Sequence, residues 1–372
     1  MSVFKAGGPP LRLACLASRT PAVATPRPTL RGLSQTRAQY YHRQNRTPTS
    51  FRQQSPTSQK ASLLLGRVVD YVGPKVSRKT HTLNQPPRIK VYYLRPAIWA
   101  LLVSSGIYIG LAYLEAEREL KPKSMFEGRF QAPQWSPPNR GPPTPTEVVT
   151  GAWRSLDPIS QTTYGIIATN AAVHLSSFVV PRFWDTLWHL PARNVNYTQF
   201  TSMFVHSGAL HIFANMYFLN NFMRPVGYSP LFEGSPYHIL AFFLSTGVLS
   251  GFAQHWSTLI SIQKRPIAEV LIRCGGASGA LFGVLGVFCV QYPHAGLGIL
   301  FVPVHFEAQY VLPAIFLFDI IGIIRGYSFV NLGHAAHLAG GLLGVAYLQF
   351  DGKTNIWKPL VRFWKRRLQR QS

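Results

Sequence analysis

Residues 273–288 read RCGGASGALFGVLGVF, which places a serine between glycines at the start of an apolar run. Glycine weakens a helix, yet the run after Ser278 is apolar enough to enter a membrane. A hydroxyl at the edge of such a run is costly to bury unless a polar partner meets it. The stretch therefore predicts a polar partner for the Ser278 hydroxyl. The small residues around Ser278 leave room for this partner to approach, and its interaction offsets the cost of burying the hydroxyl.

The composition combines a basic leader with a membrane protein. Of 372 residues, 47% are hydrophobic and 13% charged, and the formal net charge is +24. Residues 1–95 contain 17 of the 37 Lys and Arg but a single acid, Asp70. An acid-poor leader rich in Arg, Ser and Pro is typical of a mitochondrial import presequence, so we expect this region to be mostly disordered.

Two other interpretations of the leader stay open. A nucleic-acid-binding tail is also basic, but it would carry interleaved aromatic residues, and membrane spans follow here instead, so no nucleic-acid partner is expected. Residues 40–95 also fit a disordered basic linker, because presequences are usually shorter. The first residues contain no apolar segment of the kind found in secretory signal peptides, so a secretory signal is not expected. The three cysteines predict neither a disulfide framework nor a metal site.

Seven apolar runs follow residue 95, each long enough to be a transmembrane helix in a bilayer that takes about 20 residues to span. They lie at 97–114, 162–180, 203–222, 237–254, 276–292, 307–325 and 333–350. We therefore predict an all-α polytopic membrane protein. Its parts are the leader, an extra transmembrane helix at 96–115, a Pro-rich linker at 116–154, a six-helix core at 155–350 and a basic C-terminal tail at 351–372.

The connection at 181–200 contains Phe183, Trp184, Leu187 and Trp188, which share one face of a helix. This pattern predicts a short helix in the membrane interface, with an aromatic-anchored loop as the alternative. A second semi-apolar connection, 295–306, either dips toward the membrane or gates access to it, and the sequence does not decide between the two. Both ends of the chain are basic, so the charges do not predict the orientation.

Three polar clusters lie in the first halves of the third, fifth and seventh runs. They are HSGALHIFAN with His211 and Asn215, GGASGALFG with Ser278, and GHAAHLAGGLLG with His334 and His337. Alternate spans run in the same direction, so the clusters are expected at one side of the membrane and at similar depth. Polar groups at this depth indicate a functional site.

The glycines predict how these clusters meet. Gly279 and Gly283 form one GxxxG step, Gly340 and Gly344 form another, and such steps let two helices pack closely. Close packing brings Ser278 to His337, a base able to take the hydroxyl proton. The pair is interpreted as a Ser-His catalytic dyad.

Donors for a developing oxyanion are expected around the same serine. Ser278 stands near a helix N-terminus, whose free N–H groups favour negative charge, and Gly276 leaves the backbone before it unencumbered. His211 and Asn215, four residues apart on one helix face, supply further donors.

No acid lies beside His337 in the sequence. Asp319 is the only carboxylate deep in an apolar run and is expected to make a structural polar contact, with a catalytic role as the less favoured alternative. His334 is expected to support a helix contact and His206 to hold a loop. The alternative for Ser278 is a serine that only joins helices.

With these motifs in hand, residues 155–350 resemble a rhomboid intramembrane serine protease. The resemblance implies Ser278 as nucleophile and His337 as base, and it implies an oxyanion hole formed by His211, Asn215 and the Ser278 N–H, opened by Gly276. The connection at 181–200 resembles the family's first loop, although it lacks a clear Trp-Arg pair. No cofactor and no metal are implied.

The extra helix and the leader resemble the mitochondrial inner-membrane subfamily of presenilin-associated rhomboid-like proteases and their fungal counterparts. Several of those have an acid before the HAAH motif, where this chain has Gly333. The resemblance implies a multi-pass protein of the mitochondrial inner membrane. Its implied partners are the lipid bilayer and transmembrane substrates, such as dynamin-like GTPases or presequence-anchored proteins.

Other function classes fit less well. A catalytically inactive rhomboid that binds and escorts membrane proteins would be expected to lack the Ser or the His, and both are present. A metalloprotease would need HExxH, and no Glu accompanies His334 and His337. A transporter would show inverted repeats and paired broken helices.

Overall fold

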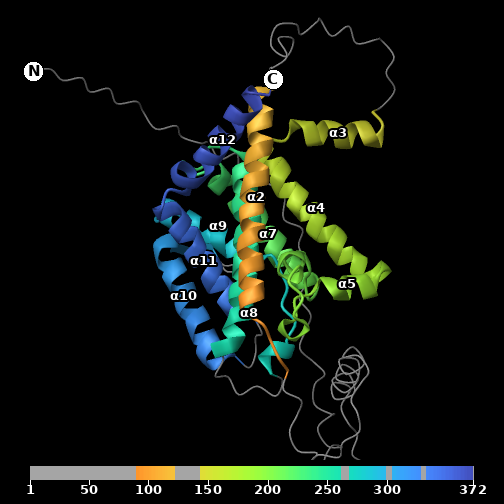
Figure 1. Ribbon diagram of the computed structural model, residues 1–372, viewed down its shortest axis with the longest axis vertical. Coiled ribbons are helices and arrows are strands. Elements are labelled where there is room, and N and C mark those ends of the chain that lie inside the picture. The colour runs from red at the N-terminus through yellow and green to blue at the C-terminus, as the bar shows by residue number, and fades with distance from the viewer. Residues whose placement is uncertain (1–88, 122–142, 261–267, 299–303, 328–331, 372) are drawn as a thin grey trace, which may run out of the picture. The chain divides into compact units, whose positions relative to one another are not determined.

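The computed structural model describes residues 89–121, 143–260, 268–298, 304–327 and 332–371, most of which are helical (Figure 1). The leader up to residue 88 and most of the linker lie outside the described residues. The α-helices are α2 Leu94–Leu120, α3 Pro145–Ser155, α4 Pro158–Val179, α5 Pro181–Leu187, α6 Thr198–Thr201, α7 Ala209–Gly227, α8 Pro236–Ile260, α9 Ser278–Gln291, α10 Ala308–Arg325, α11 His334–Gln349 and α12 Lys358–Gln369. Short 3-10 turns lie at Pro191–Arg193, Ser202–Phe204 and Glu269–Leu271, a π-turn at Lys353–Trp357, and strands β1 and β2 at Gly296–Gly298 and His305–Glu307.

A helix occupies each of the seven predicted apolar runs: α2, α4, α7, α8, α9, α10 and α11. Within the described residues, three of them are long and apolar enough to cross a membrane by length and composition alone, namely α2, α8 and α10. Helix α9 is a shorter apolar helix of 14 residues. The prediction of a mostly helical chain is therefore confirmed.

The helix boundaries differ from the prediction in the third run. Helix α7 begins at Ala209 instead of residue 203, because Met203 and Val205 lie in a turn and bury their side chains in the core. The connection at 295–306 contains an antiparallel pair in which Leu297 faces Phe306.

The region expected as a basic tail contains helix α12. Val361, Trp364 and Leu368 follow helical spacing and pack with Ala112 and Ala116 of α2, Arg362, Arg366 and Arg367 are exposed, and Lys365 is ion-paired with Glu119 of α2. An amphipathic pattern of this kind predicts a helix, and the high density of charge in the segment obscured it.

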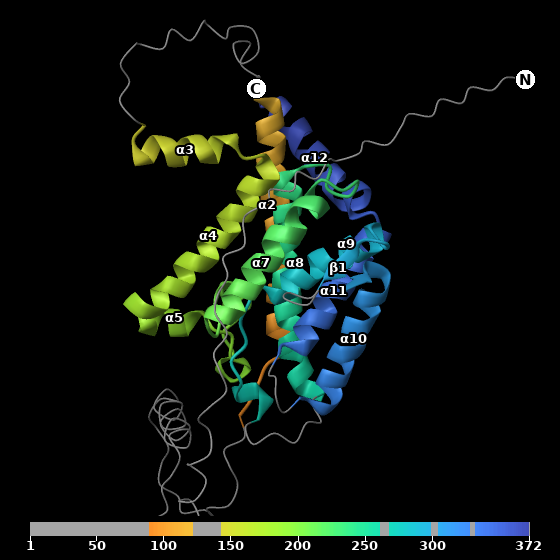
Figure 2. The same cartoon turned by 180° about the vertical axis from the view of Figure 1, so that it is seen from behind.

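Helix α9 lies inside the bundle and packs against α7, α8, α10 and α11. Its buried side chains, which include Leu281 and Val284, form the main core together with residues of α7 and α8. Helices α4 and α10 lie on opposite sides of this group in both views (Figures 1 and 2). Helix α2 runs along α8, with α12 against its C-terminal half.

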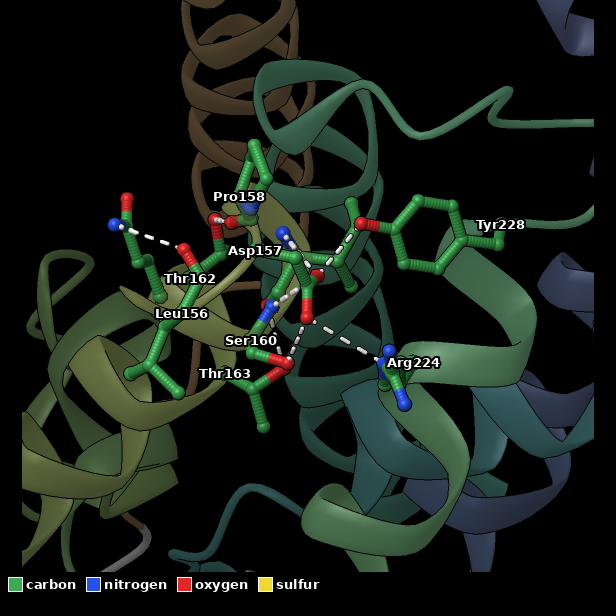
Figure 3. Close-up of polar contacts among 10 residues, drawn as sticks. Leu156, Asp157, Pro158, Ser160, Thr162, Thr163, Arg224 and Tyr228 are labelled. Carbon is green, nitrogen blue, oxygen red and sulfur yellow. Dashed lines mark hydrogen bonds and ion pairs between the residues drawn. The ribbon is translucent and has the colours of Figure 1, made fainter. Parts of the chain in front are cut away.

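Helices α4 and α7 are joined at one end by Asp157, the N-cap of α4 (Figure 3). Its Oδ1 accepts the N–H of Ile159 at 3.1 Å and the Tyr228 hydroxyl at 2.7 Å, and its Oδ2 lies 3.4 Å from Nε of Arg224. Burial raises the pKa of Asp157, but hydrogen bonds from Ser160 and Tyr228 and the Arg224 guanidinium outweigh burial and hold the pKa well below its usual range.

Replacing this carboxylate will therefore destabilise the fold in a pH-dependent way. We expect Asp157→Ala to lower the free energy of unfolding at pH 7 by about 0.5–2 kcal/mol, the usual loss for an N-cap. Because the folded pKa is depressed, this contribution is complete above the unfolded value of about 3.9 and declines as the pH falls below it. The gap between wild type and variant should narrow from pH 7 to pH 3 in detergent unfolding curves.

The matched control is Thr144→Ala, which removes the N-cap of α3, a helix without buried residues. It should leave the unfolding curve unchanged at both pH values. An Asp157→Ala gap that is equally wide at pH 3 would show that the carboxylate charge does not contribute.

Candidate functional site

Ser278 and His337 meet at the starts of two neighbouring helices. Ser278 is the first residue of α9, and His337 lies in the first turn of α11. The Ser278 Oγ is 2.9 Å from Nε2 of His337, within hydrogen-bond range. The His337 ring stacks on Phe282, one turn beyond Ser278, with ring centroids 4.2 Å apart and planes at 4°. The stacking fixes the ring orientation that points Nε2 at the hydroxyl.

Two pairs of glycines allow this approach. A Cβ atom on Gly340 would overlap the carbonyl oxygen of Gly279, and a Cβ on Gly344 would overlap that of Gly283. The backbones of α9 and α11 are therefore in direct contact along two turns, the arrangement that the two GxxxG steps predicted.

An acid that is distant in the sequence, Asp319, lies beside His337. Asp319 of α10 is 1% exposed, and its Oδ1 is 2.7 Å from Nδ1 of His334 and 3.5 Å from Nδ1 of His337. His334 packs so closely on α10 that a Cβ on Gly322 would meet its ring. The position of Asp319 in an apolar run was the signal, but its partner depended on how α10 packs on α11, which spacing does not reveal.

Gly276 shapes the backbone before the serine. Its φ of +128° is a conformation that side-chain-bearing residues rarely adopt, and its N–H donates to the Ser202 carbonyl at 2.9 Å. A Cβ there would lie 2.9 Å from Nε2 of His211. The glycine therefore makes room for the His211 ring next to Ser278.

His211 presents a donor to this space. Its Nδ1 is 3.1 Å from the Ser207 hydroxyl and accepts the Ser207 N–H at 3.4 Å, so in the neutral ring the hydrogen is on Nε2, which faces Gly276. Ser278, Gly279 and Ala280 in the first turn of α9 line the same cavity, and the N–H groups of a first helical turn have no partners within the helix. Together they form a region that favours a negatively charged oxygen.

Asn215 is placed differently from the other predicted site residues. It is buried one turn after His211, and its Nδ2 donates to the His211 carbonyl at 2.8 Å. A cavity of about 220 Å³ is lined by four of the five predicted site residues, His211, Gly276, Ser278 and His337, and Asn215 is not among its lining residues. The structure therefore brings four of them together and leaves Asn215 behind His211.

Two contributors were missed by the sequence reasoning. Gln254 of α8 lines the cavity, and its Oε1 accepts the Ala336 N–H at 3.1 Å, which holds the start of α11. Its polar side chain near the end of an apolar run was an available signal. Ser202 contributes its main-chain carbonyl, so no side-chain pattern marks it. His206 holds a loop as expected, because its Nε2 accepts the Ala277 N–H at 3.5 Å.

Asp319, His334 and His337 are also the only group among the described residues in which three ligand atoms lie within 4.8 Å of one another. The possible ligand atoms of this set interact with one another, since Oδ1 of Asp319 faces Nδ1 of both histidines. A carboxylate shared between two imidazoles accounts for the cluster as an orienting network.

Comparison with known proteins identifies the domain that holds this site. The family model "Rhomboid domain" matches residues 193–353. The chain is 35% identical over 221 residues to the presenilin-associated rhomboid-like protein, mitochondrial, of Rattus norvegicus, and 34% identical over 221 residues to that of Homo sapiens. These alignments cover 57% of this chain, and 55% and 54% of the two relatives, so the chain spans about half the length of the curated relatives it matches.

A fungal protein is similar over a shorter stretch. Rhomboid protein 1, mitochondrial, of Saccharomyces cerevisiae is 36% identical over 94 residues, which is 25% of each chain. A rhomboid domain makes the chain a polytopic membrane protein, in agreement with its apolar helices. Residues 193–353 are therefore a rhomboid domain, and the chain is a relative of the mitochondrial rhomboid proteins.

Proposed function

We propose that the chain is an intramembrane serine protease in which Ser278 is the nucleophile and His337 the base. The observation that carries this proposal is the 2.9 Å contact between Ser278 Oγ and His337 Nε2 inside a cavity that also holds oxyanion donors. Geometry of this kind activates a hydroxyl that is otherwise a weak nucleophile.

The reaction proceeds by acyl transfer. Ser278 Oγ attacks the carbonyl carbon of the scissile peptide while His337 Nε2 takes the hydroxyl proton. The negative charge that forms on the carbonyl oxygen is stabilised by His211 Nε2–H and the first-turn N–H groups of α9. The C–N bond then breaks as His337 returns the proton to the leaving amine. Water attacks the acyl-enzyme with His337 again acting as base, which releases the acid and restores Ser278.

The length of α9 supports chemistry within the membrane. Fourteen residues rise about 21 Å, less than the ~30 Å thickness of the hydrocarbon core. A helix this short leaves at least one end below a membrane surface, and the cavity with its polar groups favours the Ser278 end. This position favours peptide bonds in or near transmembrane segments as substrates.

The proposed architecture is a six-helix core of α4, α7, α8, α9, α10 and α11 preceded by the extra helix α2. The relatives are named mitochondrial, and the basic leader fits an import presequence, so we propose the mitochondrial inner membrane as the location. The proposed substrates are inner-membrane proteins, with dynamin-like GTPases and presequence-anchored proteins as examples.

The first test is cleavage of a single-span substrate by the purified protein in liposomes. Wild type should cleave and should be labelled by a fluorophosphonate, whereas Ser278→Ala should do neither, because the probe and the substrate need the same oxygen. The control is Ser245→Ala, which alters a buried serine on α8 that bonds the Ser104 carbonyl at 3.3 Å. It should keep both activities.

Failure of wild type to label, with the fold intact, would contradict the protease and favour the alternative, an inactive rhomboid-like protein that binds membrane proteins. Equal cleavage by wild type and Ser278→Ala would show that the dyad is wrongly assigned.

The second test concerns Asp319 as a positioning residue. Asp319→Asn keeps an oxygen for His334 but removes the negative charge that stabilises the imidazolium formed on His337. We expect kcat to fall on the order of tenfold to a hundredfold with KM nearly unchanged, less than for a triad aspartate, because the contact with His337 is 3.5 Å. Asp351→Asn, at an exposed carboxylate with φ of +42°, is the matched control and should keep full activity. An unchanged kcat in Asp319→Asn would make the carboxylate purely structural.

The third test separates the two oxyanion candidates. His211→Ala removes a donor that faces the cavity and should lower kcat on the order of 10²- to 10³-fold. Asn215→Ala removes an amide that donates to its own helix and does not line the cavity, so its loss should be smaller, about tenfold. Steady-state cleavage of the same substrate measures both. A larger loss for Asn215→Ala would mean that its amide turns into the cavity when substrate binds.

A further inference from the structure

A continuous set of hydrogen bonds leads from the segment before α2 to the stretch before Ser278. Its last link is the main chain of His189, whose N–H donates to the Cys274 carbonyl at 3.1 Å and whose carbonyl accepts the Cys274 N–H at 2.8 Å. The next residue, Gly275, packs on the Trp188 ring closely enough to exclude a Cβ. The backbone that leads into Ser278 therefore takes its position from the connection that contains His189.

The His189 side chain is itself held from further away. It is 3% exposed, with Nδ1 2.8 Å from the Thr198 hydroxyl and Nε2 2.9 Å from Nδ1 of His255 on α8. His255 is 1% exposed, and its Nε2 lies 2.8 Å from the carbonyl oxygen of Tyr92, two residues before α2. Two buried histidines thus connect the start of the extra helix to the connection at 181–200.

The Tyr92 carbonyl sets the direction of these bonds. Burial, with a smaller effect of His255, lowers the pKa of His189 to about 3, so its ring is neutral and has one donor and one acceptor. A carbonyl only accepts, so His255 donates from Nε2 and accepts at Nδ1 from His189. The Nδ1 of His189 is then left as an acceptor facing the Thr198 hydroxyl, whose one hydrogen is shared with the Val195 carbonyl 2.6 Å away. Without Tyr92 in place, the Nε2–H of His255 loses its acceptor in a buried site.

The segment Lys90–Tyr93 is docked by several independent contacts. The Asn194 side chain accepts the Tyr92 N–H at 2.8 Å and donates to the Lys90 carbonyl at 2.8 Å. The Tyr93 hydroxyl lies 3.1 Å from the Thr258 hydroxyl, and its ring contacts the edge of the His255 ring. These bonds are exposed or half-buried whereas His189 and His255 are buried, so the segment is the part of this hydrogen-bonded path that is most accessible to solvent.

We propose that His189 is a positioning residue for Ser278. We further propose that docking of Lys90–Tyr93 on His255 controls how well His189 holds the main chain that leads into Ser278. The inference rests on the proposed function and goes further, since it makes the segment before the extra helix a regulator of the catalytic serine. When the segment is docked, both imidazoles have their partners and the main chain at Cys274 is held. When it is displaced, the connection at His189 relaxes and the serine loses its orientation toward His337.

Two His255 variants test whether the hydrogen bonds or only the packing matter. His255→Leu fills the space without a donor or acceptor, whereas His255→Gln offers both groups to Tyr92 and His189. We expect His255→Leu to lower kcat and the rate of fluorophosphonate labelling on the order of tenfold with KM unchanged, as misplacement of a reacting group does. His255→Gln should stay within about twofold of wild type.

Two further variants test the docked segment. Asn194→Gly suits the left-handed backbone at φ of +55° and removes both bonds to the segment, so it should lower the labelling rate as His255→Leu does. The double variant with His255→Leu and Asn194→Gly should label no more slowly than either single variant, because both changes break the same chain of hydrogen bonds. The matched control is Asp351→Gly, which also places glycine at a left-handed backbone position, with φ of +42°, but removes no bond to the segment and should label at the wild-type rate.

The outcomes separate this inference from the proposed function. A wild-type protein that neither labels nor cleaves contradicts the protease itself. Suppose that wild type is labelled, but His255→Leu and His255→Gln lose equal labelling rate, or the losses of His255→Leu and Asn194→Gly add in the double variant. Either result would overturn the proposed coupling through His255 and leave the protease proposal intact. If His255→Leu does not fold, Asn194→Gly beside Asp351→Gly decides, and equal labelling rates in those two would overturn the inference.

Discussion

The direct contact between the backbones of α9 and α11 is the constraint on which the site depends. Gly340 and Gly344 lie against the carbonyl oxygens of Gly279 and Gly283, and no side chain larger than hydrogen fits between them. In a membrane, packing of this kind replaces the hydrophobic effect as the force that joins helices. It also fixes the separation of the first turns of α9 and α11, and with it the distance between Ser278 and His337.

The polar groups around this contact offset one another's cost. An isolated imidazole or carboxylate is expensive to bury at membrane depth, but Asp319 bonds His334 and lies beside His337, and His337 bonds Ser278. The four side chains come from three helices, α10, α11 and α9. A change in how α10 packs would therefore alter the surroundings of the base, even though α10 contributes neither the nucleophile nor the base.

The sequence predicted the elements whose information is local. The seven apolar runs, the two GxxxG steps and the HAAH motif each follow from spacing, and helices formed at all seven runs. Asp319 shows the limit, because its partner depended on the rotation of α10 against α11 and no residue near it in the sequence indicates that rotation. Asn215 shows a second limit: helical spacing put it on the face of His211, but its amide found a nearer acceptor in the backbone.

The extra helix α2 is hydrogen-bonded near both of its ends to the part of the chain that holds the site. At its start, Tyr92 bonds His255, and the Pro96 carbonyl accepts the Gln199 side chain at 3.4 Å. At its other end, Glu115 accepts the Trp357 indole N–H at 3.1 Å and bonds Ser235, which precedes α8. These bonds connect both ends of α2 to α8, to the segments before it and to Trp357. The Rhomboid domain match covers residues 193–353, yet the bonds that hold α2 reach into that range from outside it. Segments on either side of the domain therefore bear on the geometry of the site, because the domain alone leaves the His255 ring without the acceptor that fixes it.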